Sequence, residues 1–123
     1  APWRELLPLI DAANIDLKGF TPEWYQRLGG DLETVKRSIS LAAEQCHVEV
    51  TTLLIPGEND SEEEIRSLAQ WLASVARNIP LHLSQFFPRY RMTDKPPTPV
   101  ERVYQLADVA REHLRYVYMG NCQ

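Results

Sequence analysis

Two residues of opposite charge, Asp16 and Lys18, lie two positions apart in a segment where apolar and polar residues alternate. Such alternation is typical of a β-strand with two unlike faces, so both side chains project from one face with their roots roughly 7 Å apart. Opposite charges that point into a partly dry interior are costly unless they are paired or meet a ligand. The pair is a candidate binding site, and the alternative is a solvated ion pair at the rim of a sheet.

A second polar stripe lies on the segment that stops at Pro56-Gly57. Glu49, Thr51 and Leu53 are separated by single residues, so they share one face of the expected strand. This strand end offers a flat wall for a ligand ring, or it is an ordinary strand-to-helix turn in which Glu49 is ion-paired.

A third strand end carries His82 and Ser84 on one face. A histidine and a serine are the base and nucleophile of many hydrolases, but neither an orienting carboxylate nor a nucleophile elbow is identifiable in the sequence. A structural histidine is therefore favoured over a catalytic dyad.

Metal binding by this chain alone is not expected. The only cysteines, Cys46 and Cys122, are too few for a disulfide framework, a zinc site or an iron–sulfur cluster. His47 and His113 have no metal-ligand partner at a useful spacing.

The elements that must position these side chains are marked by periodicity and by capping residues. Alternating or β-branched segments predict strands at 13–18, 47–55, 81–87 and 115–119. Helices are predicted at 3–9, after Thr21-Pro22, after Asp31, and from capping boxes at Ser61–Glu64 and Thr98–Glu101, with a loop at 89–97. Strands separated by helices indicate an α/β fold with a parallel sheet, either doubly wound or an arc of a barrel.

Composition limits the classes of function. The 123 residues are 44% hydrophobic and 24% charged with a net charge of −4, which fits one globular domain over residues 1–123. No stretch concentrates Lys and Arg enough to neutralise a row of phosphates, so nucleic acid is not an expected partner. No apolar run approaches the ~20 residues that span a bilayer, and no signal-peptide pattern is present. A cytoplasmic protein without a membrane partner is expected.

Several segments in their order match a known pattern. They are residues 11–20 (DAANIDLKGF), 48–60 (VEVTTLLIPGEND), 82–92 (HLSQFFPRYRM), 96–99 (PPTP) and 116–121 (YVYMGN). In this combination the chain resembles the radical SAM superfamily, and more narrowly the AmmeMemoRadiSam-system radical SAM enzymes, relatives of the pyruvate formate-lyase activating enzymes. The resemblance implies parallel βα units that form the C-terminal half of a partial TIM-like barrel.

The resemblance also implies a cofactor site. In relatives an aspartate-leucine-lysine triplet contacts S-adenosylmethionine, which carries over onto Asp16, Leu17 and Lys18. The strand end near Leu53 would flank the adenine. Where activating enzymes place a histidine near the cofactor, this chain has Phe87, which cannot donate a hydrogen bond.

The expected function follows from the same resemblance. The parent enzyme would cleave S-adenosylmethionine at a [4Fe–4S] cluster and pass a 5′-deoxyadenosyl radical to an unknown protein or small molecule. The cluster-binding CxxxCxxC loop of relatives does not occur here, so this chain alone is expected to hold no cofactor and to be inactive. The alternatives are a non-catalytic α/β binding or interaction module, and a small hydrolase built on His82 and Ser84.

A half-barrel is also expected to self-associate. The strand at Ala13–Lys18 would leave one edge unpaired, and Trp3, Trp24 or Trp71 would lose the cover of the missing helices.

Overall fold

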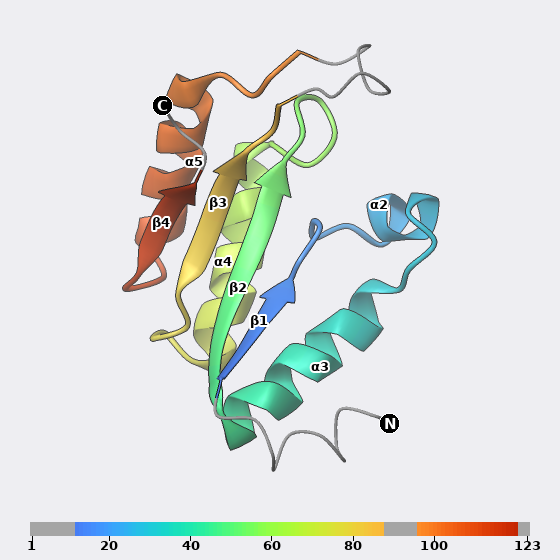
Figure 1. The fold of residues 1–123 in the computed structure, drawn as a ribbon, viewed down its shortest axis with the longest axis vertical. Helices are drawn as coiled ribbons and strands as arrows, with labels where there is room; N and C mark the ends of the chain where they lie inside the picture. The colour runs from blue at the N-terminus through green and yellow to red at the C-terminus, as the bar shows by residue number, and fades with distance from the viewer. Residues whose placement is uncertain (1–11, 88–95, 121–123) are drawn as a thin grey trace.

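The computed structural model describes residues 12–87 and 96–120, which form one four-stranded sheet with helices packed against it (Figure 1). The elements are β1 (Ala12–Asp16), α2 (Pro22–Arg27), α3 (Leu32–Gln45), β2 (His47–Leu54), α4 (Glu62–Val75), β3 (Leu81–Gln85), α5 (Val100–Arg111) and β4 (Val117–Gly120). All three strand pairs are parallel, and the spatial order β1-β2-β3-β4 is the order along the chain. An order without reversal is that of an arc of a TIM-like barrel and not of a doubly wound sheet.

The hydrophobic core lies between the sheet and the helices. Apolar residues spaced three and four apart give α3, α4 and α5 one apolar stripe each, and these stripes pack on the apolar face of the strands. Fully buried members of this core include Ile39, Val50, Leu68, Leu83 and Leu106. The predicted alternation of β1 and β2 is confirmed, because Ile15, Val48 and Val50 are all buried.

The other face of the sheet is polar and reachable by solvent. We call it the open face, and its partly or fully exposed residues are Asn14, Asp16, Glu49, Thr51, Leu53, His82, Ser84 and Tyr118. In a barrel arc this side of the sheet is the inner one.

The predicted helix starts are mostly confirmed. Thr21 accepts a hydrogen bond from the backbone N–H of Trp24, Asp31 from that of Thr34, and Ser61 from that of Glu64. The return contact of the Ser61–Glu64 capping box is wrong, however. The Glu64 carboxylate instead accepts a hydrogen bond from the backbone N–H of Phe20 at 2.7 Å.

The capping box at Thr98–Glu101 is also wrong. The N-cap of α5 is Pro99, and no side chain caps this helix. The Thr98 hydroxyl is fully buried, donates to the carbonyl of Leu54 and accepts from the N–H of Phe86. The ends of β2 and β3 leave these backbone groups inside the protein, and a buried unpaired group costs more than a missing cap.

The prediction that Trp24 or Trp71 would be uncovered is wrong for Trp24 and holds only in part for Trp71. Trp24 is buried, with 9% of its surface exposed. Trp71 is partly buried beside Phe20, with ring centroids 6.0 Å apart, and the Lys36 ammonium lies over both rings. Trp3, the helix at 3–9, most of the loop at 89–97 and Cys122 lie outside the described residues.

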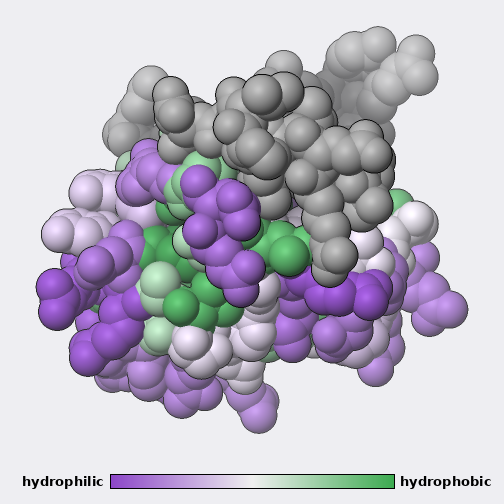
Figure 2. Space-filling view, turned by 90° about the horizontal axis from the view of Figure 1, so that it is seen from below, coloured by the Kyte–Doolittle hydropathy of each residue, from purple (hydrophilic) through white to green (hydrophobic). Residues whose placement is uncertain are grey.

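The amino ends of the strands carry a different surface. A shallow hollow here is lined in part by Cys46, Val48 and Ile79, and Figure 2 shows this end of the molecule, where apolar surface gathers between hydrophilic residues. None of the described helices has the length and apolar character needed to cross a bilayer.

Strand β1 lies at an edge of the described sheet and pairs only with β2. An edge of this kind can pair with another chain. We expect the 123-residue chain to self-associate, so sedimentation equilibrium should give an apparent mass above 14.2 kDa that rises with concentration.

A lysine at the exposed Ala12 should lower this association, because like charges would oppose each other on the paired edges. Ser67→Lys is the matched control, since it adds the same charge at an exposed position of α4 on the helical side. A monomer at every concentration, or equal effects of the two variants, would contradict edge pairing.

Candidate functional site

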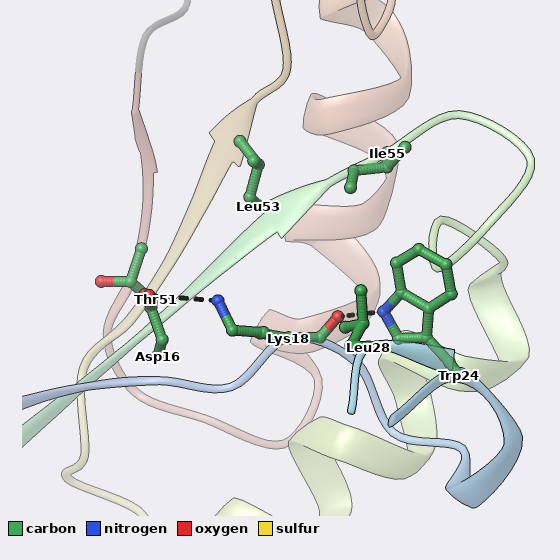
Figure 3. Close-up of a pocket in the computed structure, with 7 residues that line it drawn as sticks. All are labelled: Asp16, Lys18, Trp24, Leu28, Thr51, Leu53 and Ile55. Carbon is green, nitrogen blue, oxygen red and sulfur yellow. Dashed lines mark hydrogen bonds and ion pairs between the residues drawn. The ribbon is translucent and has the colours of Figure 1, made fainter. Parts of the chain in front are cut away.

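A hollow opens at the carboxyl ends of β1 and β2 (Figure 3). Its volume is about 170 Å³, and its lining residues are Asp16, Lys18, Trp24, Leu28, Thr51, Leu53 and Ile55. Complete small-molecule sites usually have volumes of about 300–1,000 Å³, so this hollow has room for only part of such a ligand. Figure 3 shows Leu53 and Ile55 across the hollow from Lys18 and Leu28, with the Trp24 ring at the opposite end from Asp16.

The charged end of the hollow is an exposed ion pair. Lys18 Nζ lies 3.7 Å from Asp16 Oδ2, and more than half of each side chain is exposed. This is the rim ion pair that the sequence left open as an alternative. Exposed pairs contribute about 0–1 kcal/mol, so both groups can turn toward a ligand at little cost.

The wall beside Lys18 is held by helix α2. Trp24 Nε1 donates to the carbonyl of Lys18 at 2.6 Å, and the backbone N–H of Lys18 donates to the Tyr25 hydroxyl at 2.7 Å. Burial raises the pKa of Tyr25. Gly19 makes the turn possible, because its φ is +156° and a Cβ there would lie 2.5 Å from Cδ1 of Trp24.

The buried amide of Asn59 joins the two strand ends. Its Nδ2 donates to the carbonyls of Lys18 at 3.0 Å and Leu53 at 2.8 Å, and its Oδ1 accepts from the N–H of Ile55 at 2.7 Å. One side chain therefore ties together both sides of the hollow and the loop after β2.

Glu64 supports the same turn from α4. Its carboxylate accepts a hydrogen bond from the N–H of Phe20 and is partly buried. Burial raises the pKa of this carboxyl, the hydrogen bond from Phe20 works against that shift, and the charge of Asp60 adds to it.

The structure brings together three of the five predicted site residues, Asp16, Lys18 and Leu53. The Leu17 side chain is fully buried on the helical side, so it anchors the segment between its two neighbours and does not face the hollow. Phe87 follows β3, is 49% exposed and does not line the hollow.

Sequence reasoning missed Trp24, Leu28, Ile55 and Asn59. The helix after Thr21-Pro22 was predicted, but nothing in its spacing shows that it folds over the end of β1. From the sequence, Asn59 was interpreted only as a residue of the turn that begins at Pro56-Gly57. A polar residue that ends a turn between a strand and a helix was the available signal.

Elsewhere on the open face, the structure supplies the carboxylate that the sequence did not reveal beside His82. Glu49 Oε1 lies 2.5 Å from Nε2 of His82, and Glu49 Oε2 lies 3.2 Å from Nε2 of His47. The hydrogen bonds from His82 and then His47 lower the pKa of Glu49.

Comparisons with known proteins give one sequence relative and a structural neighbour. The chain is 37% identical over 115 residues to the uncharacterized protein MJ0808 of Methanocaldococcus jannaschii, an alignment that covers 91% of this chain and 34% of the relative. The chain thus spans about a third of the length of this curated relative. No protein-family model matches the chain.

Among solved structures, a domain of the pyruvate-formate lyase-activating enzyme from Bacteroides vulgatus has a TM-score of 0.82. The overlap covers 97% of this chain and 73% of that one, at 22% sequence identity. This likeness shows the fold, a partial barrel of parallel βα units.

We expect Asn59→Ala to lower the free energy of unfolding by about 3 kcal/mol, because it removes three hydrogen bonds to backbone groups, of which the Lys18 carbonyl keeps its bond from Trp24. Urea unfolding measures this. Asn78→Ala, at an exposed position, is the control and should change little. A loss below about 1 kcal/mol at Asn59 would show that the strand ends hold together without it.

Glu64→Gln tests the partly buried carboxyl, because the amide oxygen can still accept from the N–H of Phe20 without carrying a charge. A carboxyl whose folded pKa is raised adds stability below its unfolded value of about 4.3, and that stability is lost as the pH rises through the folded pKa. The wild-type chain should therefore gain stability relative to Glu64→Gln as the pH falls from neutral toward 4. Urea midpoints across this range check it, with the exposed Glu63→Gln as control. Parallel curves for wild type and Glu64→Gln would contradict the shift.

Proposed function

We propose that this chain forms part of the barrel of a radical SAM enzyme related to the pyruvate formate-lyase activating enzymes, and that its hollow helps to bind S-adenosylmethionine. One observation carries the proposal. Asp16, Lys18 and Leu53, which the resemblance assigns to the cofactor, come from two strands and line one hollow at the carboxyl ends of a partial barrel. Ligands of parallel βα barrels bind at that end.

The residues of the hollow fit the chemistry of S-adenosylmethionine. The Lys18 ammonium can donate to a carboxylate, and the Asp16 carboxylate can accept from an ammonium or from sugar hydroxyls. Leu28, Leu53 and Ile55 give an apolar wall for a ring. Charged and apolar groups thus stand in the combination that a zwitterion attached to a nucleoside requires.

The described residues do not fit the iron–sulfur cluster. No group of three His, Cys, Asp or Glu side chains in the described part of the chain could hold a metal ion. Cys46 precedes β2 and lies about 23 Å from Leu53, by the rise of a strand. We therefore assign the cluster to a part of the enzyme that this chain does not supply.

The chain's own residues would bind and orient the cofactor. S-adenosylmethionine, when bound beside a reduced cluster, would supply a 5′-deoxyadenosyl radical to a protein or a small molecule. Lys18 and Asp16 would fix the polar end of the cofactor. Trp24 and Asn59 would keep Lys18 in place through its carbonyl.

We expect Asp16→Asn and Lys18→Met each to weaken S-adenosylmethionine binding by about 1–3 kcal/mol, the scale of a lost charged hydrogen-bond partner. Calorimetric titration of the intact enzyme gives the affinities. Stability should change little, because the ion pair is exposed.

The matched control is Asp108→Asn, which breaks another exposed ion pair, 3.3 Å from Arg111 on α5. Its affinity for S-adenosylmethionine should equal that of the wild-type enzyme. Unchanged affinity together with lowered stability in the Asp16 and Lys18 variants would favour a non-catalytic module whose ion pair only supports the rim of the sheet.

A further inference from the structure

A row of polar side chains crosses the open face beside the hollow. Asp16, Thr51, His82 and Tyr118 are register partners in one row across the four strands. Neighbouring strands lie about 4.8 Å apart, so His82 is about 10 Å from Asp16, on the far side of Thr51. A molecule bound against the sheet next to the hollow would lie against His82.

The imidazole of His82 is held in one orientation from two sides. Glu49 Oε1 lies 2.5 Å from its Nε2, and the Tyr118 ring stacks on it, with centroids 5.2 Å apart and planes at 30°. An ionised carboxylate can only accept hydrogen bonds, so Nε2 carries the proton. In the neutral ring Nδ1 is then the basic nitrogen. About a third of the His82 side chain is exposed, so a ligand can reach it.

Stability does not account for this arrangement. More than a third of the Glu49 side chain is exposed, and an ion pair screened to that extent adds little to folding. A base oriented by a carboxylate is the arrangement that general acid–base sites use.

We propose that His82 is a proton acceptor and donor for a molecule bound on the open face, and that Glu49 is its positioning residue. The ligand class is a molecule with a hydroxyl or ammonium group. Its proton passes to Nδ1 of His82, the resulting imidazolium is balanced by the Glu49 carboxylate, and the proton returns by the same path. The proposal stands on this cluster and does not depend on the cofactor assigned to the hollow.

The first measurement is the tautomer of His82, from nitrogen chemical shifts of the 123-residue chain at pH 8. We expect the Nε2–H form in the wild-type chain and a mixture of tautomers in Glu49→Gln. The tautomer tests whether Glu49 positions the ring, and the rate measurement that follows tests whether the ring transfers protons. An Nδ1–H form in the wild-type chain would overturn the proposal.

The second measurement is hydrolysis of p-nitrophenyl acetate by the same chain. The free imidazole nitrogen takes a proton from the attacking water while the water oxygen bonds to the acetyl carbon and p-nitrophenolate leaves. We expect His82→Gln to lower the second-order rate constant at least tenfold and Glu49→Gln to lower it severalfold.

His47→Gln is the matched control, because it removes the other imidazole on the same carboxylate. It should keep at least half of the rate, as should Ser84→Ala. Equal losses in the two histidine variants, or a wild-type rate no higher than that of free imidazole at the same concentration, would overturn the proposal. So would a tenfold loss in Ser84→Ala, since His82 would then serve a serine nucleophile. Circular dichroism confirms that each variant is folded.

Discussion

The buried amide of Asn59 is the interaction on which the carboxyl end of the sheet depends. It donates to two carbonyls and accepts from one N–H, and these groups belong to the ends of β1 and β2 and to the loop between β2 and α4. Without it, three polar backbone groups would each lose a hydrogen bond in the interior, and the Lys18 carbonyl would keep only its bond from Trp24. The place of Lys18, and through it the shape of the hollow, depends on this side chain together with Trp24 and Tyr25 of α2.

The sheet separates an apolar side, which is covered by helices, from the polar open face. The helical side is apolar and fully buried, so it contributes stability and leaves no room for a ligand. The open face carries the charges, the histidine and the hydroxyls, spaced by strand register and not by sequence proximity. Stability and reactivity are therefore on opposite sides of the same strands, which lets the open face vary without loss of the core.

The sequence was informative wherever a local pattern decides the outcome. Alternation in β1 identified which side Asp16 and Lys18 face, and the hydroxyl of Thr21 and the carboxyl of Asp31 mark helix starts. Prediction from the sequence failed where a side chain forms its hydrogen bond with a group distant in the sequence. Thr98 does not cap α5 but donates to the carbonyl of Leu54, and Glu64 does not bond back to its N-cap but accepts from the N–H of Phe20. The two partners are 44 residues apart in each case. The pairing of Glu49 with His82, 33 residues apart, depends on register that no single segment encodes.

Gly19 and Trp24 carry a further consequence. A Cβ at position 19 would lie 2.5 Å from the indole ring, whose N–H in turn holds the carbonyl of Lys18. Neither residue can change alone without moving the wall of the hollow. A Cβ at position 19 would also lie 2.9 Å from the Glu64 carboxylate at a φ of +156°, so in other sequences with this fold glycine at the first position should accompany tryptophan at the second. This covariation is a marker by which the same hollow can be recognised where overall identity is low.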